Sequence, residues 1–273
     1  MLALVLATDK NALDFTRQLI KGIGAHIQNT PFHLNVIPEF ERSDPAESVR
    51  YILENQTADG IILTHTSAQD PRVKFLMDAN FPFVSHGRTE FMASHAYHDF
   101  HAERYVELAI ARLANKNRHR VLLAAVDNDT TNYAITVNSF NRSIAKTELV
   151  GEVIEDPNVC RSTDNARAFG RQLATQANRC DAIVCNNELI ALAMIGGLQD
   201  KGLVLGDDYD LICKQTTEIL PILYPNMDTV AEDLFATGSE LTKLLIARID
   251  HQPLDTLQTL HQPIIHWRSD SQY

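Results

Sequence analysis

The sequence predicts an α/β protein built from two similar units, each a parallel sheet with helices on both faces. Short apolar runs alternate with stretches of helical periodicity from the first residue onward, and this alternation is typical of parallel sheets covered by helices. The same order of strands and helices repeats after about residue 100. The chain has 273 residues, of which 45% are hydrophobic, and can therefore bury a substantial core.

The first half is predicted from four apolar runs and three helix-start signals. The strand candidates are residues 2–7, 33–37, 59–64 and 81–84. Asn11, Asp44 and Asp70 each stand where a helix should begin, and a proline follows each of the two aspartates at the first helical position. Residues 90–100 are predicted to form a short irregular crossing into the second half.

The second half repeats the pattern. Helices are expected at 102–115, about 132–146, about 163–178, and in a segment that ends near Gly202. Strands are expected at 120–126, 150–155, 181–185 and 209–213. A long helix from about Ala231 to Asp250 and an extended segment at 263–267 complete the chain.

Charge and composition exclude several classes of protein. The formal net charge of -11 argues against a nucleic-acid surface on this chain, because phosphate binding requires clustered lysine and arginine. Residues 1–7 lack the basic start of a signal peptide, and no apolar run is long enough to span a membrane. The four cysteines show neither C-x-x-C spacing nor the density of a disulfide scaffold. We therefore expect a cytoplasmic protein.

No catalytic or cofactor motif stands out. His95, His98, Asp99 and His101 form the densest cluster of possible metal ligands. In an extended segment, however, residues three apart lie roughly 10 Å apart on opposite faces, so we expect no metal site there. Cys185 follows a buried strand and is interpreted as a small apolar filler. Because no carboxylate pair suggests acid–base catalysis either, we expect neither an enzyme nor a bound cofactor.

Four predicted strand ends carry polar groups. They are Gly87-Arg88, Asp129 to Asn132, Asn186-Asn187-Glu188, and Lys214-Gln215. Each group alone is also explained by a turn or a helix cap, and Asn187 in particular could cap the helix that follows it. Together they predict one lined cleft, because ligands of open α/β sheets bind beyond the carboxyl ends of the strands.

The order of motifs resembles the effector-binding core of the lac repressor family of bacterial transcription regulators. The residues that carry the resemblance are the D-G-I-I-L strand at 59–63, the strand at 81–84, the segment 113–125, CNNELIALAMIGGLQDKGL at 185–203, PNMDTVAEDLFATGSELTKLLIARI at 225–249, and PIIHWRSDS at 263–271. The resemblance covers essentially the whole chain.

The resemblance implies a periplasmic-binding-protein-like fold of two subdomains joined by three crossings. The N-terminal subdomain would comprise residues 1–100 plus 230–261, and the C-terminal subdomain residues 101–229 plus 262–273. A small polar effector would lie in the cleft between them.

By position, the resemblance assigns effector contacts to Asp9, Arg88, Asn132, Asn187 and Glu232. Arg88 would anchor the effector, Asn187 would bond to its hydroxyl or carbonyl groups, and the carboxylates would accept from its hydroxyls.

Three departures from the family pattern bear on the effector. The arginine that commonly grips a sugar falls at Thr136. A G-F-D sequence reads Cys213-Lys214-Gln215, so Lys214 and Gln215 join the candidate contacts. The acid of the first crossing falls at His101, with Asp99 two residues earlier as a substitute. Two hypotheses follow: Arg88 and Lys214 bind a sugar acid or sugar phosphate, or they pair with Asp99 and Glu232 in a neutral-sugar site.

The chain starts on the first strand of the core, without the family's N-terminal helix-turn-helix. We expect either an excised effector domain, which we favour, or a natural binding protein without a DNA arm. The leading interpretation is an allosteric sensor that controls operator binding through the absent domain, and the resemblance implies a homodimer. A solute-binding protein for a sugar-like transport substrate is the first alternative, and a metabolic enzyme on the same fold is the second.

Overall fold

The computed structural model describes residues 1–7, 13–39, 44–126 and 128–272. The chain divides into two compact units. The first unit comprises Met1–Phe100, Thr130–Asn132 and Asp233–His261. The second comprises His101–Asp129, Tyr133–Glu232 and Gln262–Tyr273.

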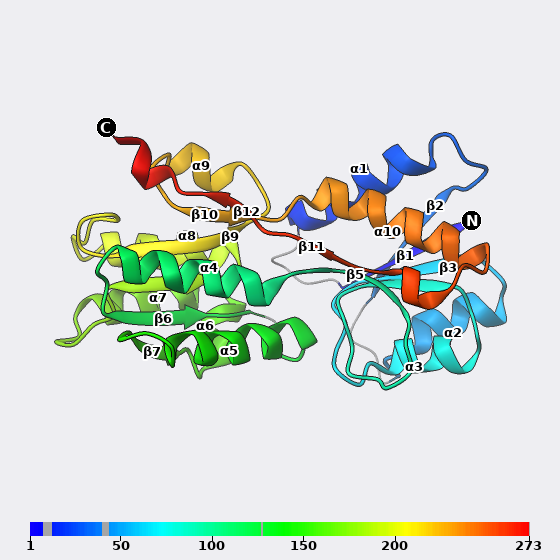
Figure 1. The fold of residues 1–273 in the computed structure, drawn as a ribbon, viewed down its shortest axis with the longest axis horizontal. Coiled ribbons are helices and arrows are strands. Elements are labelled where there is room, and N and C mark those ends of the chain that lie inside the picture. Colours follow the sequence, from blue (N-terminus) through cyan, green and yellow to red (C-terminus); the bar gives the residue numbers. More distant parts are fainter. Residues whose placement is uncertain (8–12, 40–43, 127, 273) are drawn as a thin grey trace. The chain divides into compact units, whose positions relative to one another are not determined.

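The first unit contains a six-stranded sheet in the order β11-β5-β4-β3-β1-β2, and every neighbouring pair in it is parallel (Figure 1). Its strands are β1 (Leu2–Ala7), β2 (Leu34–Glu39), β3 (Gly60–Leu63), β4 (Phe83–His86), β5 (Ala96–Phe100) and β11 (Gln258–His261). Its helices are α1 (Leu13–Ile27), α2 (Glu47–Glu54), α3 (Pro71–Asp78) and α10 (Leu234–Ile249), with the short turn η1 (Leu254–Thr256).

Strand β1, between β3 and the edge strand β2, is buried on both faces, which explains its continuous apolar sequence. Leu2, Leu4 and Leu6 belong to the core under α1 and α10. Ala3 and Val5 belong to the core under α2 and α3 on the opposite face. Successive side chains of a strand point to opposite faces, so a strand covered by helices on both sides is typically apolar along its whole length.

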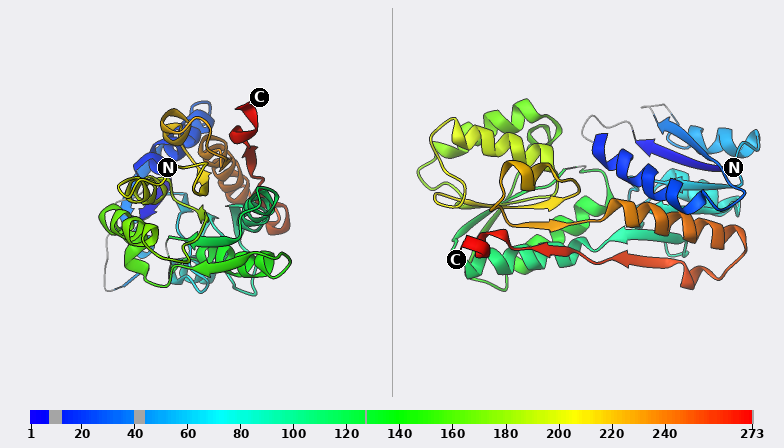
Figure 2. Two further views of the ribbon diagram at one scale, coloured as in Figure 1. Left: turned by 90° about the vertical axis from the view of Figure 1, so that its left-hand side faces the viewer. Right: turned by 90° about the horizontal axis from the view of Figure 1, so that it is seen from above.

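Helices α1 and α10 cross in close contact on one face of this sheet (Figure 2). A Cβ atom on Gly22 would lie 2.0 Å from the carbonyl oxygen of Phe235, and one on Gly238 would lie 2.3 Å from that of Leu19. Side chains cannot approach a backbone so closely, so the crossing requires glycine at both positions.

The second unit contains a six-stranded sheet in the order β12-β10-β9-β8-β6-β7, in which only β12 is antiparallel to its neighbour within the described chain. Its strands are β6 (Arg120–Ala124), β7 (Val150–Val153), β8 (Ala182–Cys185), β9 (Asp210–Gln215), β10 (Thr229–Ala231) and β12 (Ile264–His266). Its helices are α4 (Ala102–Asn115), α5 (Thr131–Ile144), α6 (Pro157–Arg161), α7 (Thr163–Ala174), α8 (Glu188–Gln199), α9 (Ile219–Leu223) and the turn η2 (Arg268–Gln272).

Helices α7 and α8 cover one face of this sheet, and α4 and α5 lie on the other (Figure 2, right). The core under α7 and α8 includes Leu122, Ile183 and Leu211 from three adjacent strands. Tyr105 of α4 is buried on the other face, and its hydroxyl donates to the carbonyl of Cys185 at 2.7 Å. The predicted class is confirmed: both units are parallel-sheet layers with helices on both sides.

The segment 90–100 differs from the prediction. Residues 96–100 form β5, which pairs in parallel with β4 and with β11, so this part of the crossing is not irregular. The sequence AYHDF does not look like a buried strand, because it contains the polar residues His98 and Asp99, yet both side chains are buried. Hydrogen bonds to other groups of the protein offset the cost of burying these side chains. A pattern of hydrophobicity does not indicate which polar residues have such partners.

Two of the helix starts were testable in the described residues. Asp70 caps α3 as predicted, since its carboxylate accepts from the backbone of Arg72 and Val73. The helix expected after Asp44 begins only at Glu47, because the Asp44 carboxylate accepts from the Ala46 backbone in a turn that precedes the helix. Asn11 lies outside the described residues.

Candidate functional site

The turn after β4 is built around Gly87. Gly87 has φ +114°, a value that favours glycine, and a Cβ atom there would lie 2.5 Å from the Thr66 hydroxyl. The Ser85 hydroxyl donates to the Gly87 carbonyl at 2.7 Å, and the Thr66 hydroxyl donates to the Arg88 carbonyl at 3.1 Å. The backbone that presents Arg88 is therefore fixed on both sides of the glycine.

A buried histidine supports this turn. His95 Nε2 lies 3.0 Å from the Ser85 hydroxyl oxygen. Because the Ser85 proton is directed to the Gly87 carbonyl, His95 must donate from Nε2. Burial lowers the pKa of His95 to about 4, although the nearby Asp70 carboxylate acts in the opposite direction. The imidazole is thus neutral at pH 7.

Arg88 is paired with Asp99. Its Nε donates to the Asp99 carboxylate at 2.7 Å, and the two side chains are 20% and 4% exposed. The pair joins the turn after β4 to the neighbouring strand β5. Asp99 therefore holds the Arg88 guanidinium by a charge-assisted hydrogen bond.

Lys214 is paired in the same way in the second unit. Its ammonium donates to the Glu232 carboxylate at 3.0 Å, and the side chains are 18% and 0% exposed. Lys214 lies in β9, and Glu232 directly follows the adjacent strand β10. The backbone N–H of Glu232 also donates to the Gln215 carbonyl at 2.9 Å, which extends the β9–β10 pairing.

Gln215 is turned toward the interior of the second unit. Its side-chain oxygen accepts from the Thr229 hydroxyl at 2.6 Å and from the Arg268 guanidinium at 3.1 Å. Gln215 is buried. In this arrangement its carbonyl links β9 to β10 and to the C-terminal segment, and does not face solvent.

Asn187 and Glu188 organise the start of α8. Asn187 Oδ1 accepts from the backbone N–H of Ile190 at 3.1 Å, so Asn187 is the helix cap that the sequence left open, and its amide group can still donate. The buried Glu188 carboxylate accepts from the hydroxyls of Thr216 and Thr217 at 2.8 and 3.2 Å. Burial raises the pKa of Glu188, against the lowering effect of these threonine hydrogen bonds.

Glu188 was absent from the predicted contacts, although it stands beside one of them. The structure gives it a positioning role: it holds the turn that directly follows Lys214 and Gln215. The signal in the sequence was the position of Glu188 directly after Asn187, within the polar group at the end of the predicted strand 181–185.

The remaining candidates differ in how far the structure describes them. Asn132 is half-buried in the first turn of α5, and residues 130–132 belong to the first unit, where the Thr131 backbone donates to the Thr66 carbonyl at 3.0 Å. Thr136 is buried in α5. Asp9 lies outside the described residues. The described candidates thus divide between the units: Arg88, Asp99 and Asn132 in the first, and Asn187, Lys214, Gln215 and Glu232 in the second.

The histidine cluster is distributed among separate partners. His98 Nδ1 lies 2.8 Å from the Thr259 hydroxyl, and His101 Nδ1 caps α4 by accepting from the backbone of Arg104. Within the described ranges, no group of three or more histidine, cysteine, aspartate or glutamate residues is arranged to hold a metal ion. In the same part of the chain, no helix is both long and apolar enough to cross a bilayer.

Comparisons with known proteins agree with this architecture. The family described as periplasmic binding protein-like domain matches residues 110–269, which is more than half of the chain. The HTH-type transcriptional regulator AglR of Rhizobium meliloti (strain 1021) is 22% identical over 251 residues, which cover 86% of this chain and 67% of the regulator.

Two solved structures show the same fold. A LacI family transcriptional regulator from Bifidobacterium animalis subsp. lactis matches with a TM-score of 0.85 and 15% identity, over 97% of this chain and 94% of the other. The transcriptional regulator CelR in complex with cellobiose matches with a TM-score of 0.82 and 19% identity, over 97% and 82%.

Two mostly parallel sheets, each covered by helices on both faces, define the chain as a periplasmic binding protein-like protein. It belongs to the periplasmic binding protein-like domain family. Its fold is that of the solved LacI family transcriptional regulator from Bifidobacterium animalis subsp. lactis.

Proposed function

We propose that the chain is the effector-sensing part of a transcriptional regulator and that its effector is a neutral sugar. Family membership and the similarity to AglR support the regulatory role. The similarity to CelR, whose solved complex contains cellobiose, supports a sugar. These comparisons do not favour the transport alternative, and the relatives are regulators without a stated catalytic activity.

We choose a neutral effector because both candidate cations, Arg88 and Lys214, are paired with carboxylates. Arg88 is bound to Asp99 and Lys214 to Glu232, and both carboxylates are almost completely buried. Each cation is therefore compensated before any effector arrives, and an anionic group would meet a carboxylate beside each of them. Neutral hydroxyls suit such pairs better, because they can donate to the carboxylate and accept from the cation. Of the two hypotheses drawn from the sequence, the structure favours the neutral one.

We propose that the effector binds between the two units, as the family resemblance implies. Arg88 and Asp99 would contact it from the first unit, with Asn132 and Asp9 beside them. Asn187, Lys214 and Glu232 would contact it from the second. Gln215 would support Glu232 through the backbone and the β9–β10 contacts described above.

Regulation would follow from a difference in effector affinity between two arrangements of the units. An effector can shift such an equilibrium only by the ratio of its affinities for the two states. We propose that the full-length protein is a cytoplasmic homodimer and that it reaches operator DNA through an N-terminal domain outside this chain. We therefore expect analytical ultracentrifugation of the full-length protein to show a dimer. A monomer at all concentrations would contradict the proposed homodimer.

A thermal-shift screen tests the proposed effector class. Neutral disaccharides, their phosphate esters and the corresponding sugar acids are compared at equal concentration. A ligand at a hundred times its dissociation constant adds about 2.7 kcal/mol to stability. We expect stabilisation by a neutral sugar and none by its charged derivatives. The reverse order would contradict the neutral-site proposal while leaving the sensor role intact.

The variant Asp99→Asn sharpens the screen. Asp99→Asn removes the carboxylate charge that the Arg88 Nε binds at 2.7 Å, so the site should gain affinity for the charged derivatives. The matched control is Asp78→Asn, which changes an exposed surface aspartate paired with Lys74. Stabilisation by charged sugars in Asp99→Asn but not in Asp78→Asn supports the assignment. Equal behaviour of the two variants removes Asp99 from the effector site.

A further inference from the structure

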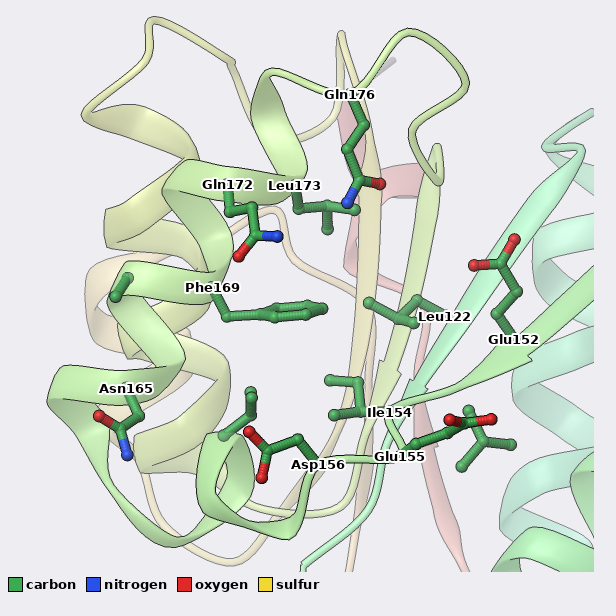
Figure 3. Close-up of a pocket in the computed structure, with 13 residues that line it drawn as sticks. Leu122, Glu152, Ile154, Glu155, Asp156, Asn165, Phe169, Gln172, Leu173 and Gln176 are labelled. Carbon is green, nitrogen blue, oxygen red and sulfur yellow. The ribbon is translucent and has the colours of Figure 1, made fainter.

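A groove in the second unit lies apart from every candidate effector residue. It has a volume of about 530 Å³ and runs between the edge strand β7 and helix α7 (Figure 3). Its lining residues come from β6, β7, the segment after β7, α6, α7 and the residues just after α7. They include none of the residues assigned to the effector.

The floor of the groove is apolar. The Phe169 ring extends from α7 into the middle of the groove, with Leu173 on one side and Ile154 on the other (Figure 3). Phe169 is half-buried, whereas Leu173 and Ile154 are buried. The floor can therefore accept a side chain of moderate size and remove it from water.

The walls of the groove carry acceptors and amides but no basic side chain. Asn165 and Gln172 line it from α7, Gln176 lines it from the residues just after α7, and Glu155 and Asp156 line it from the segment after β7. Glu152 lines it as well, and its charge is compensated by Arg120. No lysine or arginine is among the lining residues of this groove.

Glu155 is the acidic group most available to a partner. Asp156 is engaged as the cap of α6, where it accepts from the backbone of Asn158 at 3.0 Å. Glu155 is exposed, and no ion pair of its carboxylate is found within the part of the chain that the structure describes. A cation at this end of the groove would be attracted by an uncompensated charge.

The strand β7 also presents an open edge to the groove. It ends the order of the second sheet and pairs only with β6 among the described strands. The backbone N–H of Val150 donates to the carbonyl of His119, just before β6, and that of Ile154 donates to the carbonyl of Leu123 in β6. Because these groups alternate along a strand, those of Gly151 and Val153 point away from β6. An extended chain could pair with them.

We propose that this groove binds an extended segment of a partner protein in which apolar and basic residues alternate. The segment would add to the sheet by pairing with β7. Its apolar side chains would lie over Phe169, and its lysine or arginine side chains would reach Glu155. The open edge provides the backbone contacts, the floor provides the apolar contact, and the charge selects a basic segment. This inference is independent of the effector.

The test uses the full chain, labelled with ¹⁵N, and a synthetic six-residue peptide of alternating valine and lysine. We expect saturable shifts of the Gly151, Val153 and Phe169 amides. Two control peptides have alternating valine and glutamate, or the same lysines with prolines in place of the valines. The proline peptide keeps the charge but loses the valine side chains and every second backbone N–H. Equal binding of either control peptide overturns the proposal.

Three variants locate the contact. Glu155→Gln should weaken binding of the lysine peptide about tenfold, which corresponds to about 1.4 kcal/mol. The matched control is Glu148→Gln, an exposed glutamate that is not among the lining residues, which should leave affinity unchanged. Phe169→Ala should weaken binding at least tenfold, as should Val153→Pro, which removes an outward N–H at an edge where proline is tolerated.

Circular dichroism shows whether each variant is folded, and at least two of the three must be folded for the comparison. Unchanged affinity in every folded groove variant overturns the proposal. Competition by spermidine that reproduces the same amide shifts also overturns it, because the groove would then recognise an ammonium group rather than a strand.

Discussion

The protonation of His95 predicts a pH dependence of stability that can be worked out from the structure. Burial lowers the pKa of His95 from 6.5 to about 4. A histidine with a lowered pKa in the folded state binds protons more readily in the unfolded state. The contribution of neutral His95 to the free energy of unfolding is therefore fully present above pH 6.5 and decreases as the pH falls toward 4.

The magnitude follows from the size of the shift. Each pKa unit corresponds to about 1.4 kcal/mol, so His95 should remove about 3 kcal/mol of unfolding free energy between pH 7 and pH 4. The loss should be coupled to the turn that presents Arg88, because protonation introduces a charge beside the Ser85–Gly87 hydrogen bond.

Urea unfolding of the wild type and of His95→Gln between pH 4 and pH 7 measures this contribution. Gln does not titrate, so the wild type should lose about 3 kcal/mol more than the variant over this range, whatever the absolute stability of the variant. The control His33→Gln changes an exposed histidine and should follow the wild type. Parallel profiles for the wild type and His95→Gln would refute the reasoning.

Three further predictions concern helix packing, the Glu188 carboxyl and the Arg88–Asp99 pair. Gly22→Ala should cost about 2–3 kcal/mol in urea unfolding, because its Cβ would lie 2.0 Å from a carbonyl oxygen, whereas Gly24→Ala on the same helix meets no atom within 4 Å and should gain about 0.5–1 kcal/mol. Equal effects would contradict this account of the helix crossing. The raised pKa of Glu188 means that the folded state retains its proton longer, so relative to Glu188→Gln the wild type should lose stability as the pH rises above 4.5. A rise in relative stability over that range would have the wrong sign. Arg88→Ala should cost about 2 kcal/mol because it removes the cation that pairs with the buried Asp99 carboxylate, and adding Asp99→Asn should recover part of that loss. Strict additivity of the two changes would show that the pair does not interact.

The fold was predictable because the strong signals in this sequence are local. The apolar run at 2–7 and the cap at Asp70 each specify an element without reference to the rest of the chain. Strands β5 and β11 escaped prediction because they are short and polar, and they are stabilised by contacts with each other and with β4. A pattern of hydrophobicity contains no information on such partners.

The sequence predicted which residues are candidates for the site, but it did not predict which of them contact one another. Strand β9 extends to Gln215 rather than ending at Cys213, so Lys214 and Gln215 point to opposite faces of the sheet. Only Lys214 therefore joins Glu232, while Gln215 turns to Thr229. The sequence named both partners of each ion pair but could not decide whether the pairs form.

The effect of Arg88 on stability was also not predictable from the sequence. From the sequence alone, Arg88→Ala is expected to abolish effector binding and leave the stability of the free chain nearly unchanged. The structure revises the second expectation, because the Asp99 carboxylate that Arg88 compensates is only 4% exposed. Pairing between side chains eleven positions apart depends on the register of β4 with β5, and register is a property of the folded sheet.

Calorimetric titration of this chain with a neutral disaccharide and with its phosphate ester tests the central claim most directly. Because Arg88 and Lys214 are each held by a buried carboxylate, we expect the neutral sugar to bind and the phosphate ester to bind at least tenfold more weakly. Tighter binding of the phosphate ester would contradict the account, since it would show that the two cations leave their carboxylates to bind the effector.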